Sequence, residues 1–375
     1  MEGTGILRYF YLVGFANALF FSILIFSKPK RSRADKLLAG WLIFLSLQLV
    51  IPFLYLSDLS KYYPFAGIEA IFYVIHPLML YLYIKSIIGQ FPTRKQLFKL
   101  ITFALLAELT MFSFFLIPAN DRYKIIMGEM PIKGYLYVII IPVVIYFSYF
   151  IIRSFKILKD YKQNVLEVYS YKENVDLLWL RRLALFFYGS FIVCVPVLIL
   201  FYLKKVPLAE ADYVCFACLT IFIFFIGFWG YKQGEVFNLH EEVTGRNSST
   251  TTENHTTSLH PIPEDKIIAV KKIMESDKPF LNPSLTVYEL AKIVDMQPHY
   301  LSRLINQEYQ CNFFEFINQY RINAFKEYIA SDKFKGFTLL GIALECGFNS
   351  KSAFNRIFKE HTGLTPTEYK KKIAS

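Results

Sequence analysis

The chain has 375 residues, of which 54% are hydrophobic, 18% aromatic and only 19% charged, and its mean hydropathy is +0.36. This composition is too apolar for one soluble domain, so part of the chain is expected to face lipid. The net charge of +11 suits an anionic partner but does not distinguish phospholipid headgroups from nucleic acid. The five cysteines are scattered along the chain, which argues against a disulfide-stapled secreted fold.

Seven apolar stretches follow one another in the first 230 residues. Each has the length of about 20 residues that a helix needs to cross the hydrocarbon core of a bilayer. A soluble core could account for one or two such runs, but not for seven separated by short polar joints. We therefore predict an N-terminal bundle of seven transmembrane helices, at residues 9–27, 37–56, 66–88, 100–117, 135–152, 183–203 and 213–230.

The distribution of Lys and Arg predicts the orientation of this bundle, because basic residues favour the cytoplasmic side. The joints at 28–36, 89–99 and 153–182 hold 15 of these residues, and the alternate segments hold seven. The chain is thus expected to be a multi-pass protein of the cytoplasmic (inner) membrane, with its N-terminus outside. The odd number of spans then brings the C-terminal domain into the cytoplasm.

Among the charged or titratable side chains within the predicted spans, Glu69, His76 and Glu108 stand out, whereas Lys85 lies close enough to the predicted cytoplasmic end to reach the headgroup layer. Such groups are costly in lipid and usually face the interior of the bundle. One interpretation is an intramembrane sensing site for a ligand or a membrane state. The other is that these side chains form hydrogen bonds between helices and fix their packing.

The composition changes after the seventh span. Residues 243–263 are rich in Ser and Thr, lack hydrophobic periodicity and end in two prolines, which is typical of a flexible tether. We therefore divide the chain into a seven-span transmembrane domain at 1–233, a flexible linker at 234–263 and a polar C-terminal domain at 264–375. The expected fold class is all-α throughout.

Two helix-turn-helix patterns occur in the C-terminal domain, at residues 285–306 and 337–360. In the first, Thr286 and Glu289 are spaced for a capping box, and Pro298 suits the first position of the second helix. In the second, Gly347 permits a tight turn between two short helices. Apolar residues between the patterns recur every three or four positions, which predicts one long connecting helix.

A longer set of residues in the C-terminal domain accompanies the two patterns: the Ala291 to Leu304 core, Phe316-Ile317-Asn318 with Arg321, Ile342-Ala343, Gly347-Phe348, Phe354 with Arg356, Phe358-Lys359, Gly363, Thr365-Pro366 and Tyr369. By these residues, the segment 264–375 resembles the DNA-binding domain of the AraC/XylS transcription regulators. The chain departs from the pattern of that family at Asp295 and Gln310, where glycine is usual, and at Ile305, where phenylalanine is common.

The resemblance implies that the second helix of each pattern enters the major groove of double-stranded DNA. Arg can pair with guanine and Asn with adenine, while Lys and hydroxyl groups can hold phosphates. The domain has thirteen Lys and three Arg against thirteen acidic residues, a modest net charge of +3, so we expect homodimers on DNA. The implied DNA-binding residues are His299, Ser302, Arg303, Lys351, Ser352, Asn355, Arg356 and Lys359.

The sequence lacks a nucleotide-binding loop, an HExxH motif and a nucleophile elbow, so we expect no enzyme, no cofactor and no metal site. The expected partners are DNA, the lipid bilayer, RNA polymerase, a second copy of the chain and an unknown small ligand. Two alternatives stay open. The chain could be a receptor or transporter-like protein whose C-terminal helices bind a protein, or the front half could be a passive anchor.

Overall fold

The computed structural model describes residues 2–56, 74–126, 135–171, 177–202, 208–232, 262–331 and 334–374. These residues are helical apart from short connections and one isolated antiparallel bridge between Tyr169 and Thr286, which confirms the predicted all-α class for the described part. The chain divides into two compact units. The first comprises residues 1–159 and 177–249, and the second comprises 160–176 and 250–375.

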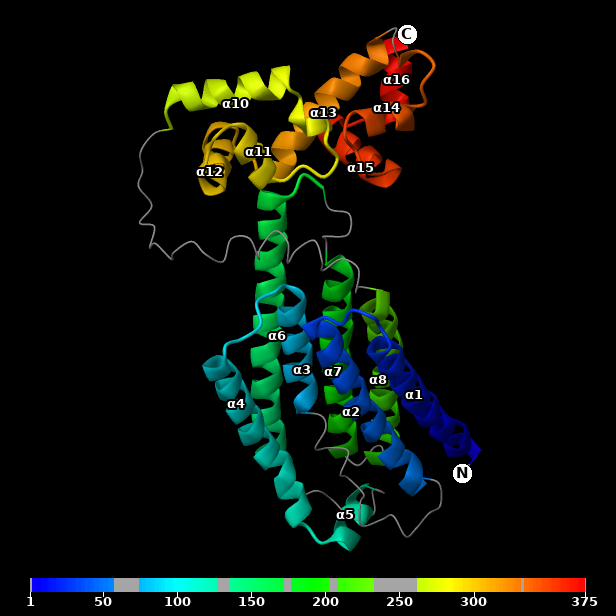
Figure 1. Cartoon of the computed structure of the whole chain (residues 1–375). Helices are drawn as coiled ribbons and strands as arrows, with labels where there is room; N and C mark the ends of the chain where they lie inside the picture. The colour runs from blue at the N-terminus through cyan, green and yellow to red at the C-terminus, as the bar shows by residue number, and fades with distance from the viewer. Residues whose placement is uncertain are drawn as a thin grey trace. The chain divides into compact units, whose positions relative to one another are not determined.

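The first unit is built from helices that are mostly apolar (Figure 1). Helix α6 contains Pro142 and contributes its last turns to the second unit. The helices are α1 (Glu2–Phe26), α2 (Arg33–Leu56), α3 (Ile75–Ile87), α4 (Arg94–Phe112), the 3-10 turn η3 (Ser113–Leu116), α5 (Ala119–Ile126), α6 (Tyr135–Val168), α7 (Leu178–Tyr202) and α8 (Leu208–Lys232).

Glycines allow α1, α2 and α8 to approach closely. A Cβ atom on Gly227 of α8 would lie 2.4 Å from the ring of Phe21 in α1, and one on Gly230 would lie 2.1 Å from Leu38 in α2. In a membrane bundle, where lipid is as apolar as the side chains, such close approach of backbones is a main source of attraction between helices.

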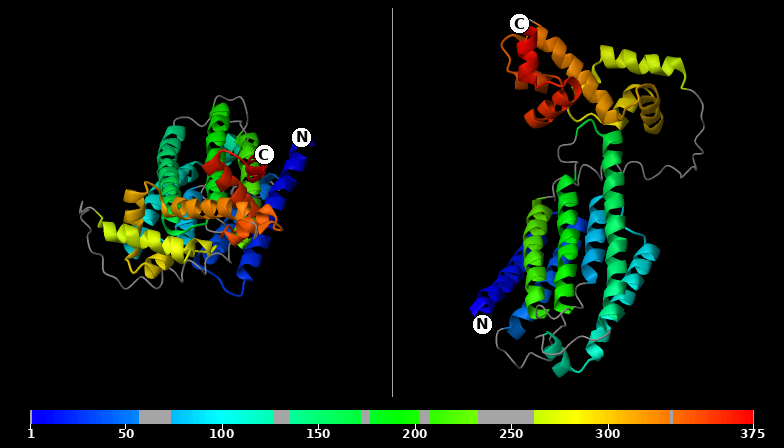
Figure 2. Two further views of the ribbon diagram at one scale, coloured as in Figure 1. Left: turned by 90° about the horizontal axis from the view of Figure 1, so that it is seen from above. Right: turned by 180° about the vertical axis from the view of Figure 1, so that it is seen from behind.

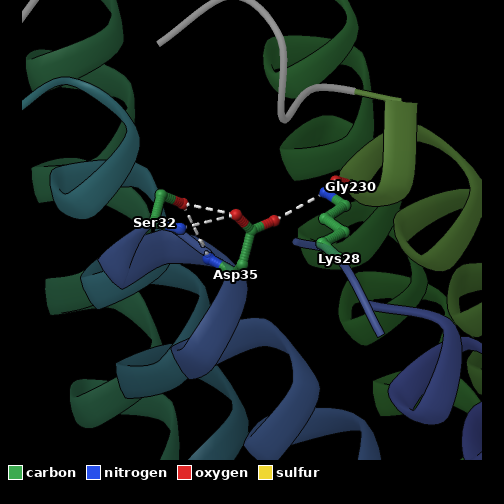
Figure 3. Close-up of polar contacts among 4 residues, drawn as sticks. All are labelled: Lys28, Ser32, Asp35 and Gly230. Atoms are coloured by element: carbon green, nitrogen blue, oxygen red, sulfur yellow. Dashed lines mark hydrogen bonds and ion pairs between the residues drawn. The ribbon is translucent and has the colours of Figure 1, made fainter. Parts of the chain in front are cut away.

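A buried ion pair fixes the cytoplasmic joint that the sequence predicts between α1 and α2 (Figure 3). Lys28 Nζ lies 2.6 Å from Asp35 Oδ1 and donates a hydrogen bond to the carbonyl oxygen of Gly230 at 3.2 Å. The second carboxylate oxygen of Asp35 accepts from the backbone N–H and the hydroxyl of Ser32, at 2.9 and 2.7 Å. These contacts connect the start of α2 to the last turn of α8.

Four stretches of the described residues are long and apolar enough to cross a membrane, and they overlap the first, fourth, fifth and seventh predicted spans. Helices α2 and α7 cover the second and sixth predicted spans, whereas residues 57–73, in which the third begins, lie outside the described residues. Large apolar side chains point outward, with Leu109 66% and Leu116 76% exposed. The four stretches are Tyr9–Phe26, Arg94–Leu116, Ile141–Val168 and Cys215–Lys232.

The second unit packs short helices around a separate hydrophobic core. The long helix α13 lies between two helix pairs, α11 with α12 and α14 with α15 (Figure 2). The helices are α10 (Glu264–Ser276), the 3-10 turn η5 (Pro279–Leu281), α11 (Val287–Ile293), α12 (Pro298–Glu308), α13 (Phe313–Ala330), α14 (Leu339–Glu345), α15 (Lys351–Thr362) and α16 (Pro366–Ala374).

Candidate DNA-binding surface

The first helix pair, α11 and α12, begins with the predicted capping box. The backbone N–H of Glu289 donates to Thr286 Oγ1 at 3.3 Å, and Glu289 Oε2 accepts from the backbone N–H of Thr286 at 2.7 Å. Pro298 occupies the first position of α12, where its missing N–H has no helical partner to lose. The contact between the two helices buries Leu290, Ala291, Leu301 and Leu304.

The backbone around α12 adopts positive φ at two residues that are not glycine. Asp295, in the turn before α12, and Gln310, just after it, both have φ of 53°. These are the two positions at which the AraC/XylS pattern has glycine. A residue with a Cβ atom is strained in this region by about 1–2 kcal/mol, which accounts for the usual glycine.

The second helix pair, α14 and α15, has a cap at each helix start and a glycine at its turn. Thr338 and Ser350 accept hydrogen bonds from the backbone N–H groups of Gly341 and Ala353, at 3.0 and 3.2 Å. Gly347 has φ of 89°, and a Cβ atom there would lie 2.4 Å from the carbonyl oxygen of Phe280. The turn therefore requires glycine for its conformation and for space. Phe354 and Phe358 of α15 are buried in the core.

Helix α13 joins the two pairs and carries a buried arginine, Arg321, which is 1% exposed. Its Nε donates to the carbonyl of Phe280 at 2.8 Å, and Nη2 donates to the carbonyl of Asn282 at 2.8 Å. Nη1 donates to the carbonyl of Ser170 at 2.9 Å, while Nη2 also reaches the Ser170 hydroxyl at 3.0 Å. The guanidinium thus connects α13 to η5, to the residue directly after η5 and to residue 170.

The residues implied for DNA contact on α15 form an exposed polar face. Lys351, Asn355 and Lys359 follow one another at four-residue intervals, which aligns them along one side of the helix. Arg356 lies 3.2 Å from Glu360, an exposed ion pair that adds little to stability but holds the guanidinium at the surface. All five implied residues of this helix are exposed: Lys351, Ser352, Asn355, Arg356 and Lys359.

The residues implied for DNA contact on α12 are less accessible. His299 is exposed, whereas Ser302 and Arg303 are half-buried. The guanidinium of Arg303 lies over the ring of Tyr300, 5.1 Å from its centroid. The Ser302 hydroxyl donates to the carboxylate of Glu167 at 2.9 Å. Sequence reasoning did not find Glu167, because no local pattern relates the joint after the fifth predicted span to a helix 135 residues later.

Of the three intramembrane candidates, His76 has partners on both ring nitrogens. Trp41 Nε1 donates to His76 Nδ1 at 3.0 Å, and His76 Nε2 lies 2.5 Å from Gln48 Oε1. Since Nδ1 accepts, the proton belongs on Nε2. Helices α2 and α3 are thereby linked, which supports the packing interpretation for this residue. Glu108 is half-buried on α4, and Glu69 lies outside the described residues.

The described residues contain no group of three His, Cys, Asp or Glu side chains close enough to hold a metal ion. Cys346 is buried between α14 and the rest of the core, and burial raises the pKa of its thiol to about 12. The thiol is therefore neutral and acts as a small apolar side chain.

Comparison with known families identifies one part of the chain. The family described as a helix-turn-helix domain matches residues 290–372, which include α12 to α15. Comparisons with curated proteins and with solved structures found no match. Residues 290–372 are thus a helix-turn-helix domain of AraC type, a DNA-binding regulatory domain and not a catalytic one, and the chain that carries it is a DNA-binding transcription regulator.

Proposed function

We propose that this regulator is anchored in the cytoplasmic membrane and acts by one-component signalling. A seven-span domain at residues 1–233 receives a signal, and the linker at 234–263 joins it to the DNA-binding domain at 264–375. The observation that carries the proposal is that one chain contains both a DNA-binding domain and long apolar helices with exposed leucines, such as Leu109 and Leu116. Large exposed apolar surfaces are rare in soluble proteins and suit lipid.

Within the DNA-binding domain, the two arginines are assigned the main base or phosphate contacts. Arg356 is exposed on α15, and Arg303 is half-buried on α12. His299, Ser302, Asn355 and the remaining implied residues support these contacts through hydroxyl, amide and ammonium groups, which can bond to base edges or phosphates. The polar faces of α12 and α15 would then read successive major-groove segments.

The N-terminus is assigned to the outside and the C-terminal domain to the cytoplasm, because Lys and Arg are concentrated in the joints at 28–36, 89–99 and 153–182. The signal is a small ligand or a membrane state sensed near Glu69, His76 and Glu108. Two DNA-binding domains pair on the promoter, because a net charge of +3 gives one domain little non-specific affinity. Contact with RNA polymerase would follow at that promoter. Single-molecule counting that found only monomers on a target promoter would exclude the pairing.

The proposal is tested by DNA crosslinking and sequencing in living cells with the full, tagged chain. We expect discrete peaks for the unchanged protein and their loss in the double variant Arg303→Ala/Arg356→Ala. A matched control is Lys271→Ala/Lys272→Ala, which removes the same charge from exposed positions on α10. Peaks that survive the arginine changes, at equal protein levels, would contradict DNA reading by α12 and α15. Binding of a protein partner through these helices would then be the better explanation.

A further inference from the structure

A short stretch of chain from far upstream packs on the DNA-binding unit. We call residues 165–171 the α6 strap; it comprises the last turn of α6 and the three residues after it. Val165 and Tyr169 are buried, and Leu166 and Val168 pack against the core of the second unit. The strap is therefore part of the DNA-binding unit in space, although about 90 residues separate it from α10 in the sequence.

The strap is held at its C-terminal end by Ser170, which is 1% exposed. Its backbone N–H and its hydroxyl donate to the carbonyl of Leu285, at 3.2 and 2.7 Å, immediately before the cap of α11. Its carbonyl accepts from Arg321 at 2.9 Å and from the side chain of Asn318 at 3.1 Å. Tyr169 pairs with Thr286 through the antiparallel bridge. These contacts fix the register of the strap on the first helix pair and on α13.

At this register, Glu167 lies on the polar face of α12. Its carboxylate oxygen accepts from Ser302 at 2.9 Å and from Asn306 at 3.2 Å. Positions 299, 302, 303 and 306 follow the three- and four-residue spacing of one helix face, so Glu167 occupies the same face as the implied DNA contacts. The Glu167 carboxylate accepts the hydrogen bond of the Ser302 hydroxyl, which would then not be free to donate to DNA, and its negative charge repels phosphates.

We infer that the α6 strap is a built-in competitor of DNA at the first helix pair, and that DNA binding requires Glu167 to leave α12. This inference rests on the proposed function, because it names the regulation of that same DNA-binding surface. The contact of Glu167 with α12 is suited to release, since it consists of two hydrogen bonds at a site that water can reach. Helix α6 is continuous from Tyr135 to Val168 and includes a stretch apolar enough to cross a membrane. A shift of that helix in response to a signal therefore moves Glu167.

The first test compares Glu167→Ala with Asp160→Ala in the full chain, reconstituted in lipid nanodiscs. Asp160 is exposed on the same helix seven residues earlier, so its replacement removes the same charge from elsewhere. The probe is a fluorescent DNA duplex of random sequence, and affinity is measured by anisotropy. Loss of the two hydrogen bonds to Ser302 and Asn306 should make Glu167→Ala bind roughly tenfold more tightly. Asp160→Ala should match the unchanged protein; equal gains in both variants would overturn the inference.

The second test locks the strap in place with the variant Tyr169→Cys/Thr286→Cys. Residues facing each other across an antiparallel bridge have Cα atoms about 4.5–5.5 Å apart, within the range that a disulfide spans. The reduced form of the same chain is the control, and peptide mapping verifies the new bond among the native cysteines. We expect the oxidised form to lose DNA binding at least tenfold and reduction to restore it.

The outcomes separate this inference from the proposed function. Equal DNA affinity of the oxidised and reduced forms would show that the α6 strap does not compete with DNA, and would leave the proposed function unaffected. Absence of DNA binding in every form, including Glu167→Ala and the reduced double variant, would overturn both. Tighter binding by the oxidised form would show that the docked strap favours DNA binding, and would overturn the competition.

Discussion

Replacing Gly347 with alanine should destabilise the DNA-binding unit far more than the same change at Gly363. Both glycines have positive φ, 89° and 74°, so either substitution strains the backbone by about 1–2 kcal/mol. They differ in their surroundings. A Cβ atom at Gly347 would lie 2.4 Å from the carbonyl oxygen of Phe280, whereas nothing lies within 4 Å of one at Gly363.

The clash at Gly347 involves backbone, which cannot rotate away as a flexible side chain can. Overpacking of this kind costs a further ~1–3 kcal/mol, so Gly347→Ala should cost about 2–4 kcal/mol once the gain from a stiffer unfolded chain is subtracted. Gly363→Ala should cost about 1 kcal/mol. The new Cβ atom at Gly347 would also lie 3.0 Å from Arg321 Nε. The substitution should therefore destabilise α13, which carries Arg321, as well as the turn.

Hydrogen exchange measured by mass spectrometry on the full chain in nanodiscs tests this difference. Peptides from α13 report opening of the unit without requiring the whole membrane protein to unfold reversibly. A difference of about 2 kcal/mol corresponds to roughly 30-fold faster exchange in Gly347→Ala than in Gly363→Ala. Similar exchange rates in the two variants would refute the steric reasoning, since only the backbone strain is common to both.

Three further predictions concern single contacts. Gln310→Gly should stabilise the DNA-binding unit by about 0.5–1 kcal/mol by relieving its positive φ, seen as slower exchange in α12; faster exchange would contradict this. The pKa of Glu368 is held below its ordinary value by the backbone N–H and the hydroxyl of Thr365. The stability that the ionised Glu368 adds to the start of α16 is therefore present above the unfolded pKa and is lost as the pH falls through the folded pKa. Exchange in α16 should then accelerate below about pH 4, and Glu368→Gln should remove that pH dependence. Lys28→Met should lower stability by about 3 kcal/mol by leaving Asp35 buried without its ammonium partner, and Lys28→Met/Asp35→Leu should recover most of it in thermal melts in detergent; a double variant no better than the single one would argue against the pair.

The parts of the fold that follow from short-range chemistry could be predicted from the sequence. The capping box of Thr286 and Glu289 and the proline that begins α12 are determined by residues within one turn of each other. The glycine at the second turn also follows from local backbone geometry. The missing glycines at Asp295 and Gln310 could be noticed by resemblance, but only the backbone showed that both positions have positive φ.

The long-range contacts could not be predicted in this way. Ser170 and Arg321 are polar residues 151 positions apart, and neither has a neighbour whose spacing suggests the other. The hydrogen bonds of His76 to Trp41 and Gln48 likewise join residues 35 and 28 positions apart. A single sequence shows that such groups need partners when buried, but which groups meet depends on helix packing that periodicity does not specify.

The separation of Ser170 and Arg321 also has a consequence for synthesis. The ribosome must add 151 residues after Ser170 before Arg321 exists, which takes roughly 10–30 s at usual elongation rates. During that time, the buried serine and its neighbours have no site to enter, while the helix before them is already made. Closure of the strap is therefore a late event in biogenesis, and a nascent chain stalled before α13 would present this segment to proteases and chaperones.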